Sequence, residues 1–484
     1  MVAMLITIAL LGMASPPPAQ TSADDSAAHA RRAQEAEQRN DFPLAVSEYR
    51  ILTSRFPHNA EVLSNLGVAL YFNHQWQQAI DVFRKAMALN PDLLPPHLFS
   101  GLAWSRLSNP DAAVPELEKA VHINPSDALA TTWLGYAYSA EARYRPAVAE
   151  FEAASRLDSS NVDVWYALGQ TWLAIGKDAT EQLLETAPDG ARVWQLAGEQ
   201  CQFRGEDAQA LRDFEQAYAR RPTDVALRNL IVSLGATPQP ATTSTTARSS
   251  ASEDAFYHDA HEAEEQSRMA FARVEQLAPD SYRAHEVLAD SLVARKHDLE
   301  AIEEYRTVLK LNPTLPDIHN AIGEALVRSG RLPEALQEFQ EEIRIQPESA
   351  TAHMNAGRAL LMEGNDNAAG AMLAAALRED RPPAETSVLM AKVELRHHED
   401  RAAIASLTRY LSEVRGDSTA YYLLFSAYRE AGDQQHMRSA MDMYLRTSRD
   451  NQERNAARRE LEQPEDAMRA TDNLSPQSAT PIHE

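Results

Sequence analysis

Three histidines recur at a constant interval in the second half of the chain. The same number of residues separates His285 from His319 and His319 from His353. Histidine is a common metal ligand, but all ligands of one metal ion must lie about 2 Å from it. Equivalent positions of successive packed helices are about 10 Å apart. We therefore interpret these histidines as packing residues and their interval as the sign of a repeat.

A denser group of candidate metal ligands comprises His258, His261 and Glu262. The two histidines are three residues apart and would share one face of a helix. The second histidine that a zinc-protease HExxH helix requires is missing. We favour a solvated helix start over a zinc site, and we predict no metal and no cofactor. The adjacent His397 and His398 are expected in a solvated turn.

Other patterns of catalytic chemistry are missing. Gly176 and Lys177 have no upstream glycine at the spacing of a phosphate-binding loop, and neither GxGxxG nor GxSxG occurs. Cys201 is the single cysteine, which excludes an intramolecular disulfide and a thiolate metal cluster. We expect its side chain to be buried in a core. The sequence therefore predicts a protein that is not an enzyme.

The elements around these residues follow the same interval. Pro57, Pro91 and Pro125 recur with a period of about 34 residues. Small or apolar landmarks recur between them, such as Leu66, Gly67, Ala79, Phe83 and Ala86. Each unit holds two apolar-periodic segments of about a dozen residues, enough for about three helical turns. Proline ends the second segment, and the small residues let two helices cross closely. The pattern predicts an all-α fold of stacked helical pairs.

This pattern resembles the tetratricopeptide repeat (TPR) family. The family consensus has Trp, Leu, Gly and Tyr on a first helix, then Ala, Phe, Ala and Pro on a second. Residues 165–169 and 194–198 match the first half, and residues 210–222 match the second. The resemblance implies an α-solenoid, a right-handed superhelix of helical hairpins.

Composition divides the chain into segments. The apolar run over 2–14 has the length of a signal-peptide core, so we expect export, with an uncleaved anchor or a cytoplasmic protein as alternatives. Thr, Ser and Pro dominate the predicted linker. The predicted segments are a signal peptide or N-terminal hydrophobic segment (1–20), a disordered stretch (21–30), an N-terminal TPR array (31–235), the linker (236–252), a C-terminal TPR array (253–449) and a largely disordered polar tail (450–484).

Two stretches depart from the regular pattern. The fifth repeat begins at Val162 but reaches its closing Pro188 earlier than the period predicts. Its second helix is therefore expected to be short, over 179–186. Residues 253–277 are predicted to be helical throughout.

Charge and repeat pattern together point to protein partners. The formal charge is −24, from 46 basic and 70 acidic residues, which disfavours nucleic acid and anionic lipid. We expect no membrane insertion beyond the N-terminal segment. The resemblance implies that the first helix of each pair lines a concave groove that binds protein or peptide segments. The groove residues it implies are Val68, Tyr71, Phe72, Leu98, Leu102, Tyr136, Tyr166 and Gln170 in the first array, and Asn320, Arg358 and Lys392 in the second.

The sequence therefore favours a non-enzymatic scaffold or adaptor. The alternative is a regulatory or recruiting subunit of an enzyme that is encoded separately. In the second array acidic and basic groove positions change over along the chain, which favours a polar or charged ligand there.

Overall fold

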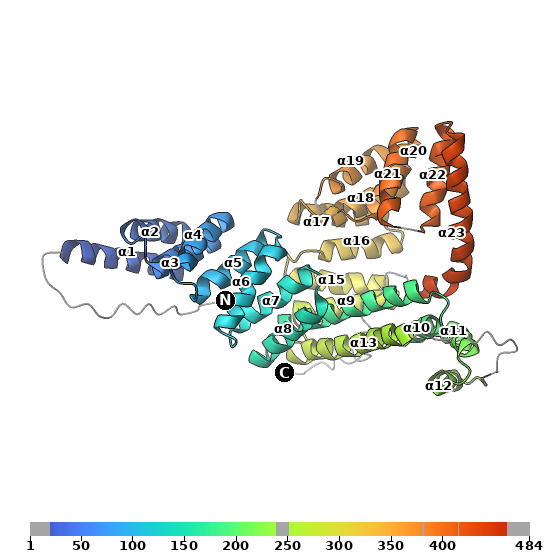
Figure 1. Ribbon diagram of the computed structural model, residues 1–484, viewed down its shortest axis with the longest axis horizontal. Helices are drawn as coiled ribbons and strands as arrows, with labels where there is room; N and C mark the ends of the chain where they lie inside the picture. Colours follow the sequence, from blue (N-terminus) through green and yellow to red (C-terminus); the bar gives the residue numbers. More distant parts are fainter. Residues whose placement is uncertain (1–19, 239–250, 380–381, 415, 462–484) are drawn as a thin grey trace. The chain divides into compact units, whose positions relative to one another are not determined.

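A computed structural model describes residues 20–238, 251–379, 382–414 and 416–461. These residues form 23 α-helices and no strand (Figure 1). The predicted all-α solenoid is confirmed. No described helix is both long enough and apolar enough to cross a bilayer. The predicted signal segment (apart from residue 20), most of the linker and the end of the tail lie outside the described residues.

The chain divides into two compact units between Thr171 and Trp172. The first unit consists of four helical pairs and the start of a ninth helix. In chain order these are α1 (Gln20–Gln38), α2 (Phe42–Arg55), α3 (Ala60–Phe72), α4 (Trp76–Leu89), α5 (Leu94–Arg106), α6 (Pro110–Ile123), α7 (Ala128–Ala140), α8 (Tyr144–Leu157) and α9 (Val162–Thr186).

The second unit contains the rest of α9 and every later helix. These are α10 (Ala191–Phe203), α11 (Asp207–Arg220), α12 (Val225–Ser233), α13 (Ala251–Leu277), α14 (Tyr282–Ala294), α15 (Asp298–Leu311), α16 (Ile318–Arg328), α17 (Leu332–Ile345), α18 (Ala350–Glu363), α19 (Asp366–Ala376), α20 (Glu385–Arg396), α21 (Asp400–Glu413), α22 (Ser418–Glu430) and α23 (Gln434–Leu461). Helix α10 packs against α11, and it also contacts α13 and α23. The units therefore divide inside α9, whereas we placed the array boundary in the linker. Helix α23 continues past the predicted end of the second array.

In six hairpins an aromatic or leucine side chain of the second helix fits over a glycine of the first helix: Gly67, Gly101, Gly135, Gly198, Gly323 and Gly357. A Cβ on Gly67 would lie 2.3 Å from Phe83 Cε1, and one on Gly323 would lie 2.4 Å from Phe339 Cε1. Both phenylalanines are fully buried. Because such a contact is far inside van der Waals distance, only glycine lets the two helices approach this closely.

The two helices of a regular hairpin are joined through one residue in the left-handed region. Glycine is suited to this conformation, but several repeats place another residue there. The turn residues with positive φ are Asn40, His74, Ser108, Ala142, Gly205, Lys296, Gly330, Gly364, His398 and Gly432. Most of them follow the register of the repeat, and the predicted turn at His397 and His398 is among them.

Helices α9 and α13 have no such turn. Gly176 stands one repeat period after Ala142, at the expected turn position, but its φ is not positive and α9 continues for 25 residues. The prediction of a separate helix over 179–186 is therefore wrong. A Cβ on Gly176 would lie 3.3 Å from the Ala263 Cβ of α13, so the unbroken α9 packs closely on α13. The prediction of one continuous helix over 253–277 is confirmed by the 27 residues of α13.

The expectation of disorder over 21–30 is also wrong, since α1 begins at Gln20. Arg55 of α2 forms an ion pair with Asp25 and donates a hydrogen bond of 2.9 Å to Ser26 Oγ. His29 contacts Glu48 across the same pair of helices. The small residues of this segment therefore form the first helix of a repeat, because α2 supplies polar partners along it.

Candidate functional site

The first helices of unit 1 carry a series of aromatic side chains. The Tyr136 ring lies 5.1 Å from that of Phe151 and 5.6 Å from that of Trp133. The Arg106 guanidinium of the preceding first helix lies 5.7 Å from the Trp133 ring centroid. Tyr136, Tyr166 and Gln170 are all partly exposed, and the Tyr166 hydroxyl accepts a hydrogen bond of 2.9 Å from Gln170 Nε2.

Phe72 extends this series at the other end. Its side chain is 42% exposed, and its ring stacks on Phe42 at 5.1 Å and meets Phe99 edge-on at 5.7 Å. Sequence reasoning missed Phe99 and Trp133, because they lie one position after the groove positions that the family implies, and it missed Phe42, because this residue begins the second helix α2. We call Phe72, Phe99, Trp133, Tyr136 and Tyr166 the aromatic face.

The other four groove residues predicted in unit 1 are buried: Val68, Tyr71, Leu98 and Leu102. Their side chains fill the space between packed helices, so they offer little surface to a partner. The accessible part of the predicted groove is therefore Phe72, Tyr136, Tyr166 and Gln170.

In unit 2 the equivalent surface is polar and its groups bond one another. Asn355 of α18 is 1% exposed, and its Nδ2 donates to Asn320 Oδ1 at 2.9 Å and to Glu324 Oε1 at 2.7 Å. Arg358 donates to the Asn355 side-chain oxygen and lies 3.7 Å from a carboxylate oxygen of Glu385 on α20. We call Asn320, Glu324, Asn355 and Arg358 the polar ladder. It links successive first helices.

The polar ladder brings together Asn320 and Arg358, two of the residues predicted from the sequence. Lys392, the third, lies partly buried on α20. Asn355 and Glu324 complete the network, and Asn355 was missed because it does not stand at a position that lines the groove in the family.

Histidines at the first landmark of several repeats pair with a glutamate of the second helix, always at the same separation in sequence. The Nδ1 to Oε2 distances are 2.5, 2.7, 2.7 and 2.6 Å for His29 and Glu48, His97 and Glu116, His285 and Glu304, and His319 and Glu338. His353 instead donates from Nδ1 to the Ser349 carbonyl at 2.9 Å. The interpretation of His285 and His319 as packing residues is thus incomplete. The constant spacing of histidine and glutamate is a signal that the sequence contained.

His97 shows the electrostatic consequence of this pairing. Burial alone would lower the pKa of His97, but hydrogen bonds to Glu116 and to the Pro91 carbonyl outweigh it, and the pKa is raised. Nδ1 faces Glu116 Oε2 at 2.7 Å and Nε2 faces the carbonyl oxygen at 2.9 Å. Both neighbours are acceptors, so a ring with both nitrogens protonated satisfies both.

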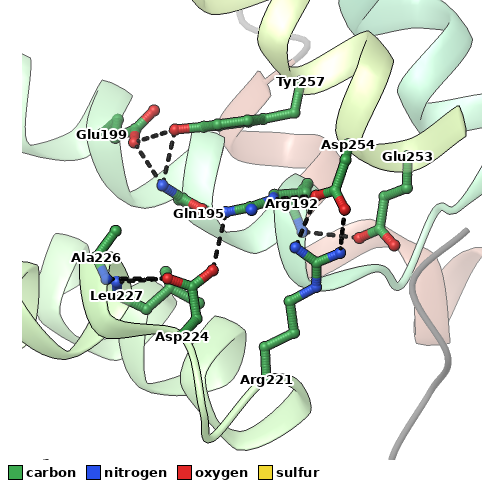
Figure 2. A network of polar contacts seen from close by, with 10 residues as sticks. All are labelled: Arg192, Gln195, Glu199, Arg221, Asp224, Ala226, Leu227, Glu253, Asp254 and Tyr257. Atoms are coloured by element: carbon green, nitrogen blue, oxygen red, sulfur yellow. Dashed lines mark hydrogen bonds and ion pairs between the residues drawn. The ribbon is translucent and has the colours of Figure 1, made fainter. Parts of the chain in front are cut away.

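A polar network joins the start of α13 to α10 and to the segment between α11 and α12 (Figure 2). Arg192, Gln195 and Glu199 of α10 stand at the second, fifth and ninth positions of their repeat, counted from Trp194 at the fourth. These positions line the groove in the family that the sequence resembles. At α10 they contact side chains of α13, which follows the linker in the chain.

Glu253 completes the N-terminus of α10. The N-cap residue Gly190 makes no side-chain cap bond, and Glu253 Oε1 accepts a hydrogen bond of 2.9 Å from the Arg192 backbone nitrogen. A Cβ on Gly190 would lie 2.6 Å from Glu253 Oε1. Glycine therefore leaves the room that this carboxylate fills, where unbonded N–H groups and the helix dipole favour negative charge.

Asp254 lies between two arginines. Both Arg221 guanidinium Nη atoms donate to its carboxylate, at 2.7 and 2.8 Å, and Arg192 Nε donates at 2.8 Å. The hydrogen bonds from Arg221, followed by those from Arg192, hold the pKa of Asp254 far below its usual value, although burial opposes the shift. Arg192 also pairs with Asp224 at 3.2 Å. The arrangement is a charge-assisted clamp.

Tyr257 lies one turn further along α13. The Arg192 guanidinium is 4.8 Å from its ring centroid. Its hydroxyl donates to Glu199 Oε1 at 2.7 Å and accepts from Gln195 Nε2 at 2.7 Å. Sequence reasoning could not find these contacts, because no local pattern relates two segments that are separated by the linker.

Comparison with known proteins agrees with the repeat geometry. Family models described as tetratricopeptide repeat match residues 60–93 and 320–384, and one described as TPR repeat matches residues 289–330. These spans coincide with α3–α4 and with hairpins of unit 2. The chain is a tetratricopeptide repeat protein.

Curated relatives share only a short part of this TPR protein. It is 43% identical to cellulose synthase operon protein C of Escherichia coli K12 over 91 residues. The same identity holds for the putative cellulose synthase operon protein C of Escherichia coli O157:H7. The match covers 18% of this chain and 8% of the relative in each case, so the chain spans a small fraction of the relatives' length.

Solved TPR-type structures are similar over parts of the chain. PilF of Pseudomonas aeruginosa is 20% identical, with 41% of this chain and 91% of that chain covered and a TM-score of 0.36. A thermophilic TPR protein of Thermus thermophilus is 16% identical, with 56% and 100% covered and a TM-score of 0.35. MamA of Desulfovibrio magneticus RS-1 is 24% identical, with 31% and 84% covered and a TM-score of 0.30.

The candidate metal ligands of this TPR protein lie on α13, and its single thiol lies on α10. His258 and His261 are exposed on α13, and His261 stacks on Tyr257 at 6.0 Å. The described residues contain no group of three or more potential metal ligands. Cys201 is fully buried beside Ala210, Phe214 and Ile231, which confirms its predicted place in the core. The accessible side chains described above are the rings of the aromatic face, the polar ladder and the charged groups at α10.

Proposed function

We propose that this protein is a non-enzymatic scaffold that binds segments of other proteins on the first-helix surfaces of its TPR repeats. The observation that carries the proposal is the aromatic face, where partly exposed rings lie on consecutive first helices. Tyrosine offers flat apolar area together with a hydroxyl, a combination enriched at protein interfaces. Helical grooves bind extended or helical peptide segments through such side chains.

The chemistry of the aromatic face defines the experiment. Proteins retained by the tagged full chain are compared with those retained by Tyr136→Ala combined with Tyr166→Ala, and with those retained by Tyr422→Ala. Tyr422 is an exposed tyrosine of α22, so it controls for loss of any surface ring. We expect specific partners to be lost only from the double variant. Retention of the same partners at the same yield by all three chains would refute this role of the aromatic face.

A second candidate function is the recruitment of an enzyme that is encoded separately. It is favoured by the similarity to a protein named after the cellulose synthase operon, over the 91 matched residues. Purification of the full chain from its own cells separates the two candidates. Co-elution of one enzyme in fixed ratio supports the recruiting subunit, and a varied set of bound proteins supports the general scaffold.

We also propose that the chain acts after export, because residues 2–14 have the length and composition of a signal-peptide core. Cell fractionation with detection of the C-terminal part tests this. Protein found only in the cytoplasm, with residues 1–20 still attached, would contradict export.

A further inference from the structure

The surface of α10 is filled by side chains that arrive from outside its own repeat. Glu253, Asp254 and Tyr257 are spaced so that they share one side of α13. Their partners are a backbone N–H, two guanidinium groups, a side-chain amide and the carboxylate of Glu199 (Figure 2). Each contact is of a kind that a bound peptide would make in a recognition groove.

We infer that the surface formed by α10 and the turn between α11 and α12 is a binding site for helical segments that carry adjacent acidic residues and, three residues later, a tyrosine, and that the first turns of α13 are its ligand in cis. Arg192 and Arg221 select the acidic residues, and Gln195 and Glu199 select the tyrosine hydroxyl. This inference rests on the proposed function, and it adds a ligand chemistry and a means of control.

The site is built to accept its ligand's carboxylates. Gly190 leaves room at the N-terminus of α10 for one carboxylate, since any Cβ there would meet Glu253 Oε1 at 2.6 Å. Arg192 and Arg221 have side chains only 16% and 15% exposed. In a chain of formal charge −24, two nearly buried arginines side by side mark a place for negative charge.

The ligand is placed so that it can leave without unfolding the array. Asp254 is 47% exposed, so the clamp is open to water on one side. Phe271 and Val274, in the second half of α13, are fully buried and hold that half in the array. Only the first turns need to move. They follow the Thr-, Ser- and Pro-rich sequence of residues 236–250.

Because the start of α13 belongs to the same chain as the site, it sets the affinity that a ligand from another molecule needs in order to displace it. A segment tethered by a short linker has an effective concentration of about 1 mM. A free segment with the same contacts therefore competes poorly, and one with additional contacts elsewhere on the repeats displaces α13. The start of α13 thereby keeps the site closed to weak ligands.

The test uses a fluorescent synthetic peptide with the sequence of residues 251–265 and the full-length chain. The open variant combines Glu253→Ala, Asp254→Ala and Tyr257→Ala, which removes the ligand in cis and leaves the site. By fluorescence anisotropy we expect the open variant to bind the peptide at least about tenfold more tightly than the wild-type chain. A folded open variant that binds no better than wild type would overturn the inference.

A charge exchange provides the specificity control. Adding Arg221→Glu to the open variant should abolish binding of the peptide, and a peptide with Asp254→Arg should bind this chain better than the original peptide does. Circular dichroism checks that each variant is folded. Equal binding of both peptides to both chains would show non-specific attachment and would also overturn the inference.

If the open variant does not fold, the wild-type chain provides the readout. Excess peptide should accelerate amide hydrogen exchange in residues 251–258 and leave α16 unchanged, and no acceleration at saturating peptide would overturn the inference. Binding at the aromatic face is measured by the Tyr136 and Tyr166 variants. A negative result at the α10 surface would therefore overturn this inference without deciding the proposed function, which the variants of the aromatic face test separately.

Discussion

Helices α10 and α16 are both first helices of a TPR repeat, yet their N-termini are completed by different parts of the chain. At α16, Glu342 of its own second helix accepts from the backbone nitrogens of Asp317 at 2.9 Å and Asn320 at 3.3 Å. The position equivalent to Glu342 in the repeat of α10 is Ala217. There Glu253 of α13 provides the carboxylate instead.

The difference lies in whether a repeat satisfies its own polar groups. In the hairpin of α16 and α17 the carboxylate is fully buried and is fixed when the hairpin forms. At α10 the same need is met by a helix that follows the linker. The carboxylate that α13 places at α10 can be replaced by a carboxylate of another molecule. The carboxylate of Glu342 cannot be replaced in this way, because it belongs to the same hairpin as α16.

The largest effect is expected at the glycine crossings. Gly67→Ala places a Cβ 2.3 Å from the Phe83 ring and should destabilise unit 1 by about 2–4 kcal/mol. Gly176→Ala meets the Ala263 Cβ at 3.3 Å and should change stability by less than about 1 kcal/mol, because alanine also favours the helix. Urea denaturation followed by circular dichroism measures both. Equal losses of stability in the two variants would mean that the glycine in a hairpin crossing is no more tightly packed than the glycine within the unbroken helix α9.

The two capping carboxylates form a matched pair of variants. Glu342→Gln should lower the stability of unit 2 by about 1–3 kcal/mol, because a fully buried acceptor of two backbone hydrogen bonds is altered. Glu253→Gln should leave the denaturation midpoint nearly unchanged and should increase proteolysis at the start of α13. Limited proteolysis alongside urea denaturation distinguishes the two. If both variants lowered the free energy of unfolding by the same amount, the start of α13 would unfold together with the array and would not be separable from it.

Arg221→Ala removes a bidentate bond to the half-exposed carboxylate of Asp254. It should lower the local stability of the start of α13 by about 1–2 kcal/mol and leave the denaturation midpoint of the unit nearly unchanged. Arg306→Ala removes an exposed ion pair to Glu303 within α15 and should lower local stability by less than about 0.5 kcal/mol. Amide hydrogen exchange at the start of α13 and in α15 gives the comparison. A change as small for Arg221→Ala as for Arg306→Ala would mean that the clamp does not hold the start of α13.

The smallest effect is the pH dependence of His97. Its pKa is raised above the usual 6.5, so the pairing stabilises the fold fully below that value, and this contribution is lost as the pH rises through the raised pKa. Relative to His97→Gln, the wild-type chain should show its largest excess in Tm at about pH 5.5 and a smaller one at about pH 8. A difference that grows with pH would contradict the assignment.

Much of this fold could be predicted from the sequence, because TPR repeats are encoded locally. Gly67 and Phe83 stand in one hairpin, and their spacing alone indicated the crossing. The unbroken α9 could not be predicted, since Gly176 is compatible with a turn and with a helix, and its packing on Ala263 of α13 decides between them.

The residues of the candidate site could be predicted only where they stand at the first-helix positions that line the groove in the TPR family. Tyr136 and Tyr166 were found through their groove positions, whereas Leu98 and Leu102 share that register and are buried. The pairing of α10 with Glu253 depends on a contact across the linker. No periodic pattern encodes such a contact, so the structure was needed to find it.

Hydrogen exchange of the full chain tests most directly whether the start of α13 is a separable occupant of the α10 surface. Asp254→Asn keeps the size of the side chain and removes the charge that Arg221 and Arg192 clamp. We predict that amides at the start of α13 exchange at least about tenfold faster in the variant, while those of α16 are unchanged. Unchanged exchange in both helices, or an equal increase in both, would contradict the account.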